Sequence, residues 1–299
     1  MNMLFPLIAV LIWSINTIVS KLSANSIDPA AISFYRWLLA FLMLTPFCLP
    51  SVWRQRAVVK AHAWRLLLLG LLGMVLYQSL AYYAAHSVSA VMMGILGGTI
   101  PLLTILLSVL VLRLAPTRGI LAGGVLSFAG LVWLVSAGEP ARLLHQPLGA
   151  GEVMMLAAST SYALYGVLTR RWAIPLTVWH SLYVQIFCGV LLLLPGFLHA
   201  PTVALTARNL PLVLYAGLLA SILAPYLWIQ GVQRLGASNT SLFMNIVPVF
   251  TAVIAVLFLH EQLHAYHWIG GGMTLAGVIV AQRVQTPLRR SPPISESEP

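Results

Sequence analysis

Residues 260–264 read HEQLH, a spacing of residue types that could bind zinc. In the H-E-x-x-H motif of metalloproteases, two histidines four residues apart lie one helical turn from each other and both coordinate the metal. The glutamate beside the first histidine acts as general base toward a metal-bound water. His260, Glu261 and His264 therefore raise the hypothesis of a zinc enzyme, which depends on the elements that would have to position them.

The composition indicates a membrane protein. Of the 299 residues, 60% are hydrophobic and 7% are charged, and the mean hydropathy is +0.93, whereas about a quarter of the residues in an ordinary soluble domain are charged. Six acidic and sixteen basic side chains are too few to cover a soluble fold of this length, so the apolar surface must face lipid. Cys48 and Cys188 both fall within apolar stretches, which predicts neither a disulfide framework nor a metal-ligand pair.

The sequence predicts an all-α integral membrane protein with ten transmembrane helices. A span requires about 20 mostly apolar residues, and charged residues, prolines and glycines divide the chain into ten such stretches. They are 3–20, 30–49, 64–84, 88–112, 117–136, 149–168, 177–198, 210–233, 237–259 and 266–281. The polar segment 284–299, rich in Pro and Ser, is expected to be a disordered cytoplasmic tail.

The basic residues indicate the orientation of the chain. Twelve of the sixteen lysines and arginines fall on the side of the membrane that both termini share, which predicts cytoplasmic termini in a multi-pass protein of the cell inner (plasma) membrane. Lys21 and Arg36 lie near the outer ends of the first two spans. They could attract a carboxylate or extend to the membrane interface, and we expect the second.

Two segments of the chain, starting at Gly98 and Asn245, align without a gap. Pro101 matches Pro248 at an offset of 147 residues, so residues 1–138 and 139–283 are predicted to be two copies of one five-helix unit. Because five is odd, the second copy must cross the membrane in the opposite sense. Such an inverted repeat suits alternating access to a central site, although a duplication could also serve only to pack ten helices.

The repeat bears on the HEQLH motif, because RLAPT occupies its position in the first copy. HEQLH is therefore expected at a helix end or turn. The remaining candidate for a third metal ligand is His267, which on one continuous helix would lie about 10 Å from His260. That separation is too large for both side chains to bind one zinc at ~2 Å, and no metal site or cofactor is expected.

This arrangement resembles the EamA-type transporters of the drug/metabolite transporter superfamily over nearly the whole chain. The family pattern is Pro, an apolar run, Gly-Glu-x-Leu and Gly-x-x-Leu-x-x-x-Gly. His260 replaces its first Gly, and the first copy has Arg113-Leu114 in place of Gly-Glu. The resemblance implies transport of amino acids, other metabolites, nucleotide precursors or toxic compounds. The matching residues are Pro248, Glu261, Leu263, Gly270 and Gly277, with Trp13, Asn16, Lys21, Pro29 and Arg36 resembling the first two helices.

Polar side chains within the predicted spans should face the bundle interior, where water or cargo can satisfy them. An interhelical hydrogen bond is the alternative role for each one. The expected substrate-binding or pore residues are Asn16, Tyr77, Gln78, Tyr82, Ser159, Tyr162, Gln185, Tyr226, Gln230 and Asn245.

Small residues and prolines predict mobile helices. Gly97 and Gly98 precede Pro101, and Pro248 is its counterpart, so these four residues are candidates for gating or helix kinks, with static packing as the alternative. Two acidic residues, Glu152 and Glu261, are candidates for proton coupling, but both are expected near the outer surface, which leaves facilitated diffusion open.

The sequence therefore predicts a secondary transporter and not an enzyme. An interior with amides, hydroxyls and aromatic rings but little fixed charge favours the export of amino acids or related small neutral or zwitterionic metabolites. The expected partners are this small-molecule cargo, the lipid bilayer and a proton if transport is coupled, and no nucleic acid. The alternatives are an intramembrane zinc metalloenzyme built on HEQLH and a non-transporting membrane receptor or scaffold.

Overall fold

The computed structural model describes residues 2–113, 117–141, 148–235, 240, 242–284 and 286, and every regular element among them is a helix. The all-helical class expected from the sequence is confirmed for these residues. The predicted disordered tail lies outside the described residues, apart from 284 and 286.

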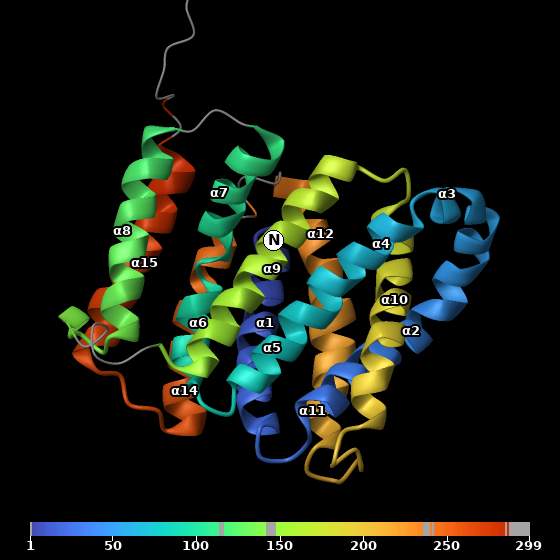
Figure 1. Cartoon of the computed structure of the whole chain (residues 1–299), viewed down its shortest axis with the longest axis horizontal. Helices are drawn as coiled ribbons and strands as arrows, with labels where there is room; N and C mark the ends of the chain where they lie inside the picture. Colours follow the sequence, from blue (N-terminus) through green and yellow to red (C-terminus); the bar gives the residue numbers. More distant parts are fainter. Residues whose placement is uncertain are drawn as a thin grey trace, which may run out of the picture.

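The helices run almost without interruption along the chain (Figure 1). Up to residue 135 they are α1 (Leu4–Ser23), α2 (Pro29–Arg54), α3 (Arg56–Ala61), α4 (Ala63–Gly70), η1 (Leu71–Leu76), α5 (Tyr77–Ala84), α6 (Ala90–Gly97), α7 (Ile100–Leu112) and α8 (Arg118–Val135). After it they are α9 (Ala150–Trp172), α10 (Val178–Leu198), α11 (Leu210–Leu214), η3 (Tyr215–Leu223), α12 (Ala224–Leu235), η4 (Leu242–Ile246), α14 (Val247–Leu259) and α15 (Ala265–Arg283).

Local sequence explains where several of these helices begin. Asp28 accepts a hydrogen bond from the Ala30 amide at 2.8 Å, with Pro29 at the first position of α2. Ser89 caps α6 and Thr177 caps α10 in the same way. A short polar side chain before a helix satisfies amides that lack an intrahelical partner, so these residues determine where the chain enters each helix.

Two long helical stretches each contain a π-helical segment. η1 joins α4 to α5, and η3 joins α11 to α12. Leu71, the first residue of η1, corresponds at the offset of 147 residues to Leu218 within η3. Because a π turn carries one more residue than an α turn, it shifts the helical face that follows and changes which side chains point inward.

Glycines bring α8 and α15 into backbone contact at one side of the molecule (Figure 1). A Cβ atom added to Gly130 would lie 2.7 Å from the Gly270 carbonyl oxygen, and one added to Gly270 would lie 2.8 Å from the Gly130 oxygen. Gly123 and Gly277 meet in the same reciprocal way. Because these glycine positions carry no side chains, the two helices approach closely enough for extensive van der Waals contact.

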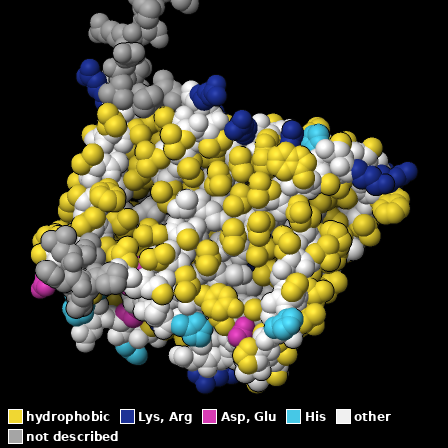
Figure 2. Space-filling model, in the orientation of Figure 1, with side chains coloured by type: hydrophobic (Ala, Val, Ile, Leu, Met, Phe, Trp, Pro, Cys, Tyr) yellow, Lys and Arg dark blue, Asp and Glu magenta, His cyan; other side chains and the backbone are white. Residues whose placement is uncertain are grey.

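The outer surface suits a lipid environment. Large apolar side chains such as Phe47, Leu110, Phe128 and Phe258 are exposed. Figure 2 shows a broad hydrophobic band, with most of the visible Lys and Arg side chains along one edge and the visible Asp, Glu and His side chains mostly at the other. We call the first edge the basic end. The protein is a multi-span membrane protein.

Seven segments of the described chain are long and apolar enough to cross a membrane, which is fewer than the ten predicted. They are Leu4–Ser23, Pro29–Arg54, Ala63–Ala84, Ala90–Leu112, Arg118–Val135, Val178–Leu198 and Leu210–Leu235. Of the other predicted spans, α9 carries charged residues near both ends, α14 has 13 residues, and α15 is rich in glycine and polar residues. Their lower apolar content or length separates them from the seven.

Candidate functional site

A central cavity of about 570 Å³ lies between helices from both halves of the chain. Its lining comes from α1, α2, the α4–η1–α5 and η3–α12 stretches, α6, α7, α9, α10, η4 and α14. Ligand pockets typically measure about 300–1,000 Å³ and are mostly apolar with a few polar groups, so this cavity has the size expected for a small-molecule site.

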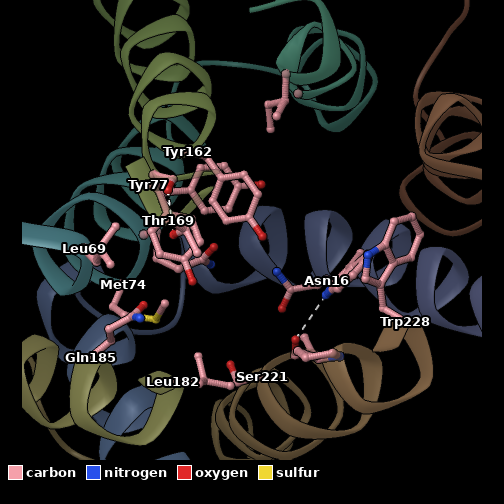
Figure 3. A pocket seen from close by; sticks show the side chains of 18 of the residues that line it. Asn16, Leu69, Met74, Tyr77, Tyr162, Thr169, Leu182, Gln185, Ser221 and Trp228 are labelled. Carbon is pink, nitrogen blue, oxygen red and sulfur yellow. Dashed lines mark hydrogen bonds between the residues drawn. The ribbon is translucent and has the colours of Figure 1, made fainter. Parts of the chain in front are cut away.

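Half of the polar residues expected to line a pore do line this cavity: Asn16, Tyr77, Gln78, Tyr162 and Gln185. In Figure 3, Tyr77 and Tyr162 lie on one side of the space and Trp228 on the other, with Asn16 between them. The Tyr77 and Tyr162 rings are in contact, with centroids 4.6 Å apart. The cavity therefore offers amide groups and aromatic faces to a ligand.

Two other expected residues lie buried behind the lining. The Ser159 hydroxyl donates to the Leu96 carbonyl oxygen at 3.2 Å, next to the break between α6 and α7. Tyr82 is 1% exposed and its hydroxyl accepts a hydrogen bond from Nη1 of Arg36 at 3.3 Å. Tyr82 therefore contacts a lining residue, Arg36, whereas Ser159 contacts the backbone next to the lining residue Gly97.

The remaining three expected residues lie away from the cavity. Tyr226 is 45% exposed and its ring lies beside Trp179. The Gln230 side chain accepts a hydrogen bond from Arg234 at the surface, and Asn245 donates to Gln282 at 3.1 Å. The polarity of a residue within a predicted span does not reveal which side of the helix it lies on. The sequence therefore could not separate these three residues from those that line the cavity.

The glycines and prolines proposed for gating form the wall where α6 meets α7. Gly97, Gly98 and Pro101 line the cavity. Pro248 is buried directly behind Gly98, because a Cβ atom on Gly98 would lie 2.6 Å from the Pro248 Cγ atom. Pro101 and Pro248 each stand in the first turn of their helix, where a missing amide costs no intrahelical hydrogen bond.

Arg36 is a lining residue that the sequence analysis placed at the membrane interface. Its side chain is 4% exposed and contacts the cavity. The Nε atom donates to the Ser221 hydroxyl at 2.7 Å, and Nη1 donates to the Asn16 side-chain oxygen at 3.4 Å. The expectation that Arg36 extends to the interface is wrong, because it lies two turns inside α2 and α1 and η3 enclose it. Its rarity as an intramembrane charge was the signal that could have identified it.

Lys21 also points inward instead of to the interface. Its ammonium group donates to the carbonyl oxygens of Ala85 and Val88, both at 2.8 Å, in the connection between α5 and α6. In this connection, Ala85 is 0% exposed and Val88 is 2% exposed. At the other end, the cavity lining continues to Val178, which is 61% exposed at the start of α10. The connection beside Lys21 is therefore tightly packed, whereas the cavity lining includes an exposed residue at the start of α10.

HEQLH lies in the turn between α14 and α15, as the repeat predicted, and not on a helix. Each carboxylate oxygen of Glu261 accepts one hydrogen bond from the start of α6, from the Ala90 amide at 2.7 Å and from the Val91 amide at 3.0 Å. His260 has a left-handed backbone conformation, with φ of 54°. The two imidazoles are not stacked on one helical face, and Glu261 is engaged as a helix cap.

The described residues contain no cluster of three His, Cys, Asp or Glu side chains that could hold a metal ion. His264 and His267 cap the start of α15 by hydrogen bonds between their side chains and backbone amides. The geometry of these residues is that of helix capping, so the arrangement required by the zinc-enzyme hypothesis is not formed by HEQLH.

Glu152, the other candidate for proton coupling, lies in the first turn of α9. A carboxylate there is stabilised by the positive end of the helix dipole. Neither Glu152 nor Glu261 is among the residues that line the cavity.

Comparison with known proteins gives consistent results. The profile of the EamA-like transporter family matches residues 1–136 and 149–282. An uncharacterized transporter of Archaeoglobus fulgidus is 28% identical over 93% of this chain and 96% of its own. A probable terminal-alkyne amino-acid exporter of Streptantibioticus cattleyicolor is 27% identical over 72% of each chain. A solved structure titled "Crystal structure of protein" shares the fold, with a TM-score of 0.61, 19% identity and coverage of 94% of this chain and 96% of that one.

Proposed function

Because this chain belongs to the EamA-like transporter family, we propose that it is a secondary transporter that exports amino acids or related small neutral or zwitterionic metabolites by alternating access. The central cavity is the observation that carries this proposal. It combines a size suited to a metabolite with amide, hydroxyl and aromatic groups in an apolar wall. We interpret the tightly packed connection beside Lys21 as its closed end and the exposed lining at the start of α10 as its open end, which together would be one state of an alternating-access cycle.

We infer the direction of transport from the distribution of the basic residues. Twelve of the sixteen basic residues belong to the side that both termini share, which supports cytoplasmic termini in the inner (plasma) membrane. In that orientation the cavity opens toward the cytoplasm, ready to bind a cytoplasmic metabolite. Lys21 and Glu261 then hold the outer end closed.

Ten spans in two inverted repeats would supply the two states. The packing supports this part of the proposal, because α1 contacts α12 and α14, whereas α9, its counterpart at the offset of 147 residues, contacts α5 and α7. The counterparts of α12 and α14 at this offset are α5 and α7. Adding α9, α14 and α15 to the seven strongly apolar segments completes the ten.

Amino acids are proposed as cargo for two reasons. The lining amides of Asn16, Gln78 and Gln185 can bind the polar end of such a molecule, while the aromatic rings accommodate its side chain. One of the related proteins is named as a probable exporter of an amino acid. Gly97, Gly98, Pro101 and Pro248 are proposed as the hinge between the two states.

The test is counterflow of radiolabelled amino acids into proteoliposomes preloaded with an amino-acid mixture, with and without an imposed pH gradient. Saturable exchange supports the proposal. Stimulation by the gradient would assign proton coupling and direct attention to Glu152 and Glu261, whereas exchange that ignores the gradient would assign a facilitator. No exchange of any amino acid would refute the proposed cargo.

A blocking variant gives this assay its control. A Cβ atom on Gly97 meets only Met155 Cε, at 3.6 Å, so leucine at this position would extend into the cavity. We expect Gly97→Leu to abolish counterflow while the protein keeps its thermal stability in detergent. Gly124→Leu is the matched control, because nothing lies within 4 Å of its Cβ position, and it should transport normally.

A further inference from the structure

We propose that Arg36 binds a carboxylate group of the cargo, and that the cavity accepts small organic carboxylates with an apolar or aromatic body whether or not they carry an amino group. This inference rests on the proposed transport function and specifies its substrate class. It starts from the one charged side chain among the described residues that line the cavity.

All described hydrogen-bond partners of Arg36 are uncharged. The guanidinium group donates to the Ser221 hydroxyl, the Asn16 amide oxygen and the Tyr82 hydroxyl, at 2.7, 3.4 and 3.3 Å. Its carbon atom lies 5.2 Å from the centre of the Trp37 ring. These contacts orient the guanidinium plane, but none of them neutralises its charge.

The positive charge on Arg36 persists because arginine is not deprotonated in proteins. A buried charge without a counterion is costly, and in membrane spans such residues mark pathways for ligands of opposite charge. Three of the five guanidinium N–H groups account for the hydrogen bonds above, and the structure gives Nη2 no partner among the described residues. An entering carboxylate would satisfy both the charge and the free donors.

The rest of the lining suits the apolar part of such a molecule. Trp13 and Trp228 are in contact with ring centroids 5.5 Å apart, and Tyr162 contacts both Tyr77 and Tyr165. The described lining contains no acidic side chain. An ammonium group therefore finds neutral oxygens and aromatic faces but no opposite charge, and a carboxylate finds Arg36.

A purely structural role for Arg36 makes a different prediction. In that case the side chain would only tie α2 to η3 and α1 through Ser221 and Asn16. Its replacement would then lower stability, and all ligands would lose affinity equally. Selectivity between ligands of matched shape separates the two roles.

The test measures binding to the purified full-length protein in detergent by calorimetry, since the uncharged forms of weak acids and amines leak across bilayers. Two sets of ligands share one apolar body each: L-phenylalanine, hydrocinnamate and phenethylamine, and L-leucine, isocaproate and isopentylamine. The inference predicts that the amino acid and the simple carboxylate of at least one set bind with similar affinity, and that the amine binds about 10- to 100-fold more weakly, in line with a charge-assisted hydrogen bond.

Variants then assign the carboxylate site to Arg36. In Arg36→Gln, carboxylate affinity should fall about 10- to 100-fold, while amine affinity stays the same or rises. Arg36→Lys should recover part of the loss, because it restores the charge but not the planar fork. Arg208→Gln, which removes an exposed arginine outside the cavity, should leave all affinities unchanged.

The outcomes are distinct from those of the transport assay. If amino acids exchange across the membrane but amines bind as tightly as carboxylates, or if Arg36→Gln weakens all ligands equally, the inference is overturned and the transport function stands. If no amino acid exchanges and none of the six ligands binds, both proposals fall.

Discussion

The turns that follow α7 and α14 occupy corresponding places in the two halves. Their comparison shows which features depend on the backbone conformation and which on the side chain. Both helices end at a non-glycine residue in the left-handed region, Arg113 with φ of 55° and His260 with φ of 54°, which are 147 residues apart. The next residue is Glu261 in the second half and Leu114, outside the described residues, in the first. The backbone ending is the same in both halves, whereas the carboxylate that caps α6 comes from one half alone.

A second pair of corresponding residues, nearer the cavity, also differs in its side chains. Arg36 in α2 corresponds at this offset to Tyr183 in α10, and both helices pack against each other. The Tyr183 hydroxyl lies 3.1 Å from the Thr45 hydroxyl, and its ring stacks on Phe41. The first half therefore places a charge at the cavity, whereas the second half places a neutral ring in the packing between α2 and α10.

The largest stability effect is expected for Glu261, the capping carboxylate that only the second half supplies. Glu261→Ala leaves two amides of α6 without their partner, so unfolding free energy should fall by about 2 to 4 kcal/mol. Thermal denaturation in detergent measures this change. Glu139→Ala, which removes an exposed glutamate, should alter stability by less than about 0.5 kcal/mol. Equal losses in the two variants would mean that the Glu261 contacts carry no stability.

Variants in the contact between α8 and α15 test whether the corresponding glycines of the two halves contribute equally to stability. Gly130→Ala should cost about 1 to 3 kcal/mol, because its Cβ atom would lie 2.6 Å from the Thr274 amide nitrogen and the backbone has to shift. Gly277→Ala, the corresponding change, should cost about as much.

Gly124→Ala is the control for this contact, since its Cβ position is open. It should stabilise the protein by up to about 1 kcal/mol through helix propensity. Thermal melts of the three variants measure these changes in stability. A large difference between Gly130→Ala and Gly277→Ala would show that the two glycines do not contribute equally.

The smallest effect concerns the two left-handed residues. His260→Gly and Arg113→Gly should each stabilise the protein by about 1 kcal/mol, because glycine adopts positive φ without a Cβ clash. His260→Ala removes the imidazole without relieving the backbone, so it should bring no gain. Melting temperatures that rise as much for alanine as for glycine would show that the side chain, not the backbone, is the source of strain.

The sequence by itself determined the features that depend on composition and local order. Apolar stretches between charged residues predict helices in lipid, because unpaired backbone groups are costly there and helices satisfy their own. The alignment of Pro101 with Pro248 placed HEQLH at a helix end or turn. His260, which replaces a glycine of the pattern that the sequence resembles, adopts the left-handed backbone that glycine favours.

Only the tertiary structure decided which polar residues share the cavity, since that depends on helical phase, on the π-helical segments and on which helices pack together. Tyr226 faces outward and Tyr162 inward, although both were equal candidates in the sequence. Arg36 and Glu261 acquire their roles from partners more than 150 residues away, Ser221 and the amides of Ala90 and Val91. Spacing along the chain fixes neither contact, because both arise where distant helices meet in the folded bundle.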